Sequence, residues 1–73
     1  MKHSKKMEMV RLVLAISRDY RDLKRLSVGI VLDDLLKQAR YTMRLLTDRL
    51  HDEGHVTLAK KLDLRVAVRI QHA

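Results

Sequence analysis

The stretch RLHDEGHVTLA, residues 49–59, decides how the chain folds, because the sequence pattern changes at its glycine. Before Gly54, apolar residues recur at steps of three and four, which is the period of a helix with one buried face. After Gly54, apolar and polar residues alternate, which is the period of a strand. Glycine commonly ends a helix, because it adopts the left-handed conformation without steric cost. We therefore expect a helix to end at Gly54 and a different element to follow.

The residues after Gly54 predict a β-hairpin. In LDLRVAVRI, residues 62–70, apolar side chains occupy every second position, at Leu62, Leu64, Val66, Val68 and Ile70. The shorter stretch HVTLA, residues 55–59, alternates in the same way and predicts a second strand. Lys60 and Lys61 would join the two strands in a loop or bulge, because tight turns prefer Asn-Gly or Asp-Gly.

The residues before Gly54 predict three helices. Apolar positions from Met9 to Leu23 indicate a first helix over about residues 6–23, preceded by a flexible basic arm at residues 1–6. A second apolar series begins at residue 28, and Thr42 is placed to cap a third helix over residues 42–53. The expected order is helix, helix, helix, strand, strand, in one domain over residues 7–73.

This order resembles that of the winged helix-turn-helix superfamily of DNA-binding proteins. The stretch LLTDRLHDEGHVTL, residues 45–58, is similar to the end of many recognition helices there, with apolar residues at steps of four, then acids, Gly and a β-branched residue. The stretch QARYTMRLL, residues 38–46, is similar to that of small pilus-operon regulators of the PapI/FaeA type. The resemblance implies an α+β fold, mostly α, whose third helix enters the major groove and whose C-terminal hairpin, the wing, lies along the backbone.

Charge and composition narrow the partners of the chain. Residues 1–26 carry eight Lys and Arg against three Asp and Glu, residues 27–54 carry four against five, and residues 55–73 carry four against one. A net charge of +7 indicates a polyanionic partner, most commonly nucleic acid. The absence of cysteine excludes disulfides and thiolate zinc sites, and the apolar runs are too short to cross a bilayer. We expect a soluble, cytoplasmic protein.

The pattern and the resemblance together predict a small, sequence-specific regulator of transcription that binds double-stranded DNA. Residues near the start of the third helix would meet bases and phosphates, while the wing and the last strand would neutralise phosphates. The expected DNA-binding residues are Arg40, Tyr41, Thr42, Arg44, Thr47, Lys60, Lys61, Arg65 and Arg69. A homodimer is expected, formed through the edge of the last strand or through the first helix.

An alternative follows from the apolar series between residues 28 and 50, which keeps a helical phase throughout. One unbroken helix over residues 28–53 would make the chain a helical protein-interaction module, a homodimeric adaptor or a phage-type inhibitor, without DNA binding. The four histidines are scattered, and the adjacent carboxylates of Asp33 and Asp34 would point apart on a helix. We therefore expect no enzyme activity, metal, cofactor, membrane contact or small-molecule substrate.

Overall fold

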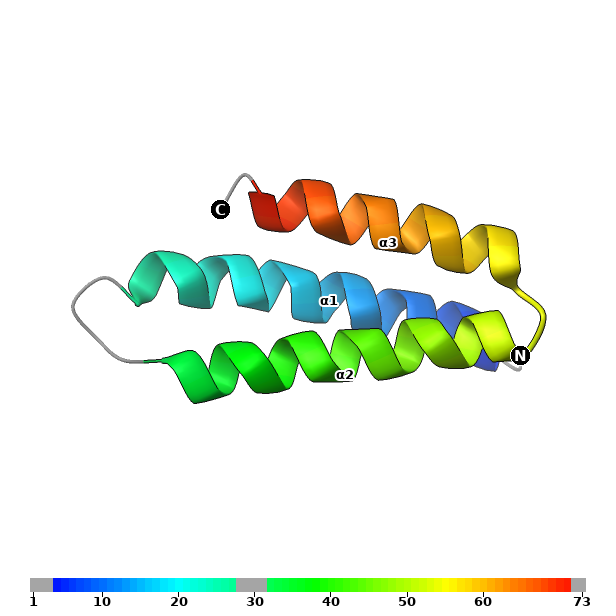
Figure 1. Ribbon diagram of the computed structural model, residues 1–73, viewed down its shortest axis with the longest axis horizontal. Coiled ribbons are helices and arrows are strands. Elements are labelled where there is room, and N and C mark those ends of the chain that lie inside the picture. Colours follow the sequence, from blue (N-terminus) through cyan, green and yellow to red (C-terminus); the bar gives the residue numbers. More distant parts are fainter. Residues whose placement is uncertain (1–3, 28–31, 72–73) are drawn as a thin grey trace.

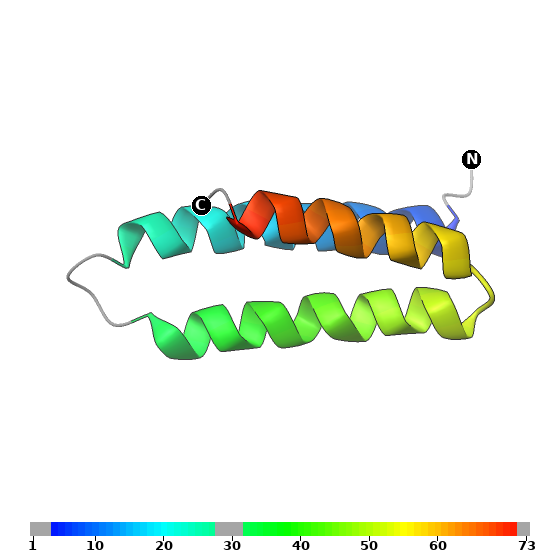
Figure 2. The same ribbon diagram turned by 45° about the horizontal axis from the view of Figure 1, so that its top comes forward.

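The chain forms a bundle of three helices in the computed structural model, which describes residues 4–27 and 32–71. Helices α1 (Lys5–Leu26), α2 (Asp33–Asp52) and α3 (Val56–Gln71) each contact the other two. Helices α1 and α3 run in the same direction, and α2, which lies between them in the sequence, runs in the opposite direction (Figures 1 and 2). The described residues contain no strand, so the expected α+β fold with a C-terminal β-hairpin is wrong.

Helix α1 includes the predicted first helix and extends it at both ends. Ser4 caps its start, and the Ser4 Oγ accepts a hydrogen bond of 3.2 Å from the backbone N–H of Met7. Lys5 and Lys6 are therefore helical and do not belong to a basic arm, while residues 1–3 of that expected arm lie outside the described residues. The hydroxyl of Ser27 donates to the carbonyl of Lys24 over 2.7 Å, at the helix end.

Helix α2 runs without a break through residues 38–42, where a helix-turn-helix would have its turn. The hydroxyl of Thr42 donates to the carbonyl of Gln38 over 2.9 Å, a bond made inside a helix, so Thr42 is no N-cap. A separate recognition helix over residues 42–53 does not exist, and that prediction is wrong. The alternative of an unbroken helix is confirmed over Asp33–Asp52; residues 28–31 of its expected start lie outside the described residues.

The predicted helix end at Gly54 is confirmed. Gly54 has a φ of +94°, and its N–H donates to the carbonyl of His51 over 3.0 Å. The N–H of His55 donates to the carbonyl of Leu50 over 2.9 Å. These two bonds form a Schellman motif, which satisfies carbonyl groups left free at the end of a helix. The chain then turns directly into α3.

Gly54→Ala is expected to lower the free energy of unfolding by about 1 kcal/mol, because a Cβ strains the left-handed backbone. No atom lies within 4 Å of an added Cβ, so the loss would come from the backbone and not from a clash. Urea denaturation followed by circular dichroism measures it. Gly54→Asn is the matched control and should lose less, since Asn tolerates this conformation better; equal losses would contradict the assignment.

Helix α3 occupies the segment that the alternating pattern predicted as strands. Residues four apart share a face in a strand and also in a helix, so Leu62, Val66 and Ile70 fit both structures. In the helix these three pack on the core, whereas Leu64 and Val68 are 69% and 55% exposed. The period of two was therefore misleading, because contacts with α1 and α2 bury a helical face of α3 that includes Leu58, Ala59, Leu62, Val66 and Ile70. Neither the wing tip nor the strand edge expected for dimerisation exists.

The core lies along the line where the three helices meet. Its buried apolar residues are Val13 and Tyr20 of α1, Met43 and Leu50 of α2, and Ala59 and Leu62 of α3. Ser17 and Thr47 are also buried, and their hydroxyls donate to the helix carbonyls of Leu14 and Met43 over 2.7 and 2.8 Å. Burial of these hydroxyls costs little, because each has a hydrogen-bond partner.

Candidate nucleic-acid interface

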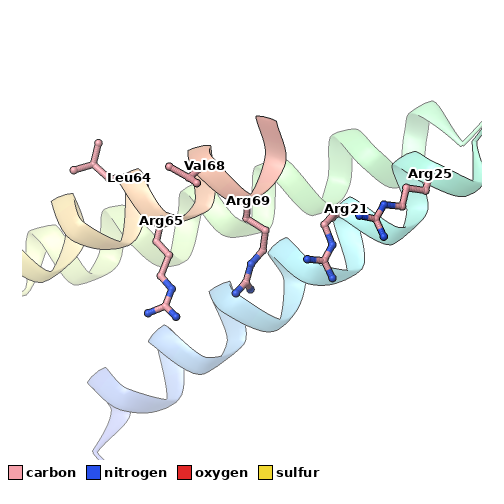
Figure 3. Close-up of a pocket in the computed structure, with 6 residues that line it drawn as sticks. All are labelled: Arg21, Arg25, Leu64, Arg65, Val68 and Arg69. Carbon is pink, nitrogen blue, oxygen red and sulfur yellow. The ribbon is translucent and has the colours of Figure 1, made fainter. Parts of the chain in front are cut away.

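Four arginines line the junction of α1 and α3, and we call them the arginine seam: Arg21, Arg25, Arg65 and Arg69. Two come from each helix at a spacing of four, which places them on one face. Because α1 and α3 run side by side in the same direction, the two pairs follow one another along the junction. Figure 3 shows the guanidinium groups of Arg65 and Arg69 pointing from α3 toward α1, followed by those of Arg21 and Arg25.

Arg69 is anchored across the two helices. Its Nη1 donates to the carbonyl of Leu14 over 3.0 Å and to the Oγ of Ser17 over 3.1 Å. Among the described residues its side chain makes no other hydrogen bond, so the N–H groups of Nε and Nη2 can donate to a ligand. A guanidinium with one nitrogen fixed loses little further rotamer freedom on meeting an anion. The seam therefore contains a pre-organised donor.

Arg21 has an unused donor in the same junction. Its Nε is buried, has no hydrogen-bond partner among the described residues, and lies 3.5 Å from the Oδ1 of Asp22. The side chain as a whole is 31% exposed, so part of the guanidinium reaches solvent. An anion held at the exposed nitrogens would face a cation that Asp22 neutralises only in part.

The charge of the molecule is concentrated on α1 and α3. Helix α1 carries seven Lys and Arg against three acids, α3 carries four against one, and α2 carries four of each. Among the described residues, no carboxylate lines the seam or the adjoining groove, to which Arg11 and Arg18 of α1 contribute. An excess of like charges in the seam and this groove, of which only Arg21 has a nearby carboxylate among the described residues, produces a positive potential that attracts a polyanion.

The nine residues expected to bind DNA do not form one surface. Arg65 and Arg69 lie in the seam, and Lys60 and Lys61 are exposed near the start of α3 instead of at a wing tip. Arg40 and Arg44 line a different groove, between α2 and α3, that also includes Asp63.

The other three expected residues also lie on α2. Tyr41 is 64% exposed. The hydroxyls of Thr42 and Thr47 donate to carbonyls of their own helix, and Thr47 is only 4% exposed. A side chain as buried as Thr47 does not reach a ligand. Helix α2 therefore contributes no continuous contact surface.

Sequence reasoning missed the arginines of α1. Arg11, Arg18, Arg21 and Arg25 follow at steps of seven, three and four, which is the spacing of one helical face. That signal was present in the sequence, together with the excess of basic residues over residues 1–26. The expected recognition helix placed the site on α2 instead.

Comparisons with protein-family models, with curated proteins and with solved structures found no match to this chain. Within residues 4–27 and 32–71, no group of three or more His, Asp or Glu side chains is arranged to hold a metal ion. The same part of the chain contains no helix with the length and apolar character needed to span a membrane.

Proposed function

We propose that this chain is a non-enzymatic nucleic-acid-binding module whose arginine seam contacts the phosphates of double-stranded DNA. The observation that carries the proposal is the row of four guanidinium groups from two helices, which no carboxylate of the described residues lines. Arginine suits phosphate, because its planar fork donates two parallel hydrogen bonds to phosphate oxygens. The pre-anchored Arg69 supports the same ligand chemistry, because, among the described residues, its Nε and Nη2 remain free to donate.

The aromatic residues favour a duplex over a single strand. Proteins that bind single strands stack the bases on aromatic side chains beside a basic groove. This chain has two such residues: Tyr20 is 6% exposed, in the core, and Tyr41 lies on α2. Neither lines the seam. Contacts from the seam would therefore go to the backbone of a duplex.

Backbone contacts position a protein on DNA but do not read its sequence. The expected reading of bases by residues 42–53 depended on a recognition helix that α2 does not provide. The proposal is therefore binding driven by phosphate contacts. A role in regulating transcription would require a preference for some sequences, which competition between duplexes of different sequence measures.

The double variant Arg25→Gln/Arg65→Gln tests the seam. Both side chains are exposed, so their removal should leave the fold intact. We expect the affinity for a short DNA duplex to fall about 10- to 60-fold at about 0.1 M salt, because each lost phosphate contact retains about one counterion. Fluorescence anisotropy with a labelled duplex measures this change.

The matched control is Arg40→Gln/Arg44→Gln, which removes the same charge from exposed positions on α2. Its affinity should fall by about threefold or less, since distant exposed charges are largely screened. Similar losses in the two double variants would mean that only net charge matters, and they would overturn the role of the seam.

The alternative of a protein-interaction module is favoured by a different observation. Helix α2 is continuous, and α2 and α3 each expose apolar side chains away from the core. Leu64 and Val68 of α3 border the arginine seam, but their side chains have no donor for a phosphate.

A further inference from the structure

The outer faces of α2 and α3 each expose a pair of apolar side chains four residues apart. On α2 these are Tyr41 and Leu45, 64% and 50% exposed, and on α3 they are Leu64 and Val68, 69% and 55% exposed. Figure 3 shows Leu64 and Val68 pointing away from the guanidinium groups of the seam. Neither pair is buried in the core of the bundle, so packing within one molecule does not account for these apolar side chains.

On each helix charged residues lie next to the apolar pair, at one of its ends, and these charges have opposite sign on α2 and α3. On α2, the acids Asp48 and Asp52 follow Leu45 at steps of three and four, and both are exposed. On α3, Lys61 precedes Leu64 by three residues and is also exposed. Among the described residues, neither Asp48 nor Lys61 has an ion-pair partner within 4 Å. Each face thus consists of an apolar pair with a charged end, and the two ends have opposite sign.

We propose that α2 of one molecule packs antiparallel against α3 of a second copy of this chain. In this register Leu45 meets Leu64, Tyr41 meets Val68, and Asp48 meets Lys61. The register follows from the spacing: residues 41, 45, 48 and 52 advance by four, three and four, and residues 68, 64, 61 and 57 descend by the same steps. Steps of three and four are those at which two packed helices keep contact.

Symmetric pairing of either face is disfavoured by charge. Two parallel copies of α3 would bring Lys61 against Lys61, and two antiparallel copies centred on their apolar pairs would place Lys61 opposite the uncharged Gln71, without an acidic partner. Two antiparallel copies of α2, centred on their apolar pairs, would place Asp34 against Asp52. Facing like charges oppose association. The α2–α3 contact avoids both conflicts, so the two faces are complementary to each other and not to themselves.

The contact joins unlike faces, so it leaves one of each free on every pair of molecules and allows further copies to add. Within each molecule, α2 and α3 meet at the turn of Gly54 and His55. Both helices rise equally per residue, so two residues that are the same number of positions from this turn, one on each helix, lie level along the bundle axis. Asp48 and Lys61 form one such level pair. Successive copies are therefore related by rotation without a shift along the helices, which excludes a helical filament and closes into a ring when the rotation divides a full turn.

Reversal of single charges tests this contact in analytical ultracentrifugation and native mass spectrometry. The wild-type chain should form a concentration-dependent oligomer larger than a dimer. Asp48→Lys and Lys61→Asp should each raise the concentration needed for association about tenfold or more, because each creates a like-charge pair. An equimolar mixture of the two variants, and the double variant Asp48→Lys/Lys61→Asp, should both regain association.

Asp34→Lys is the matched control. It makes the same charge change on the exposed face of α2, but its partner in this register would lie beyond the end of α3. It should associate as the wild type does. Three results would each overturn the proposal. The wild-type chain could stay monomeric at millimolar concentration, its association could stop at a dimer, or the double variant could fail to regain association. DNA binding measured below the protein concentration at which the chain self-associates tests the seam independently of this outcome.

Discussion

Leu62→Ala is expected to lower the free energy of unfolding by about 3–5 kcal/mol, whereas Leu64→Ala should change it by less than about 0.5 kcal/mol. The same substitution, two residues apart, has different effects because Leu62 is 4% exposed and Leu64 is 69% exposed. A chain of this length holds about 4–11 kcal/mol in all. Leu62→Ala should therefore unfold at a far lower urea concentration.

Circular dichroism during urea denaturation measures both variants at concentrations too low for self-association. In a strand, Leu62 and Leu64 would share the buried face, and both substitutions would be costly. Large losses in both variants would contradict helix α3 and favour the hairpin. A loss confined to Leu62→Ala would support the bundle.

The affinity of the wild-type chain for duplex DNA should fall about 150-fold between about 50 and 200 mM salt. Four phosphate contacts, one for each arginine of the seam, correspond to a slope of about −3.6 in a plot of log affinity against log salt. The physical reason is that each contact releases condensed counterions from the DNA, and added salt opposes that release. Anisotropy titrations of one duplex at several salt concentrations measure this slope.

Arg25→Gln/Arg65→Gln should reduce the slope to about −1.8, since two contacts remain. Arg40→Gln/Arg44→Gln should leave it near the wild-type value. A flat salt dependence of the wild-type chain would exclude phosphate-driven binding and leave the protein-interaction alternative. A steeper slope for a single strand than for a duplex would contradict the choice of duplex.

Those parts of the fold that depend on neighbouring residues were predictable. The apolar stripe from Met9 to Leu23 identified α1, because the side chains of one helical face recur locally. Gly54 identified the end of α2, because a residue without a Cβ adopts the left-handed conformation at a helix end most easily. The continuous phase across residues 38–42 also indicated the unbroken α2, and it was a better guide than the resemblance to winged domains.

The site was predictable only in part. Arg65 and Arg69 were expected to contact phosphate, but as residues of a strand beside a wing. Their neighbours Arg21 and Arg25 belong to a distant part of the sequence, and no local pattern joins the two pairs. Thr47 was expected on the outer face of a recognition helix and is buried, because α3 and α1 both pack on α2.

By itself the sequence determined the first amphipathic helix, the helix end at Gly54, and the basic character of both ends of the chain, and it left open whether residues 28–53 form one helix or two. Only the tertiary structure decided that residues 62–70 are helical and that the arginines of α1 and α3 form one seam. The reason is that Leu62, Val66 and Ile70 satisfy the period of a strand and of a helix alike. When a local pattern fits two structures, the packing that buries it decides between them. Here Leu62, Val66 and Ile70 pack on the core that α3 shares with α1 and α2.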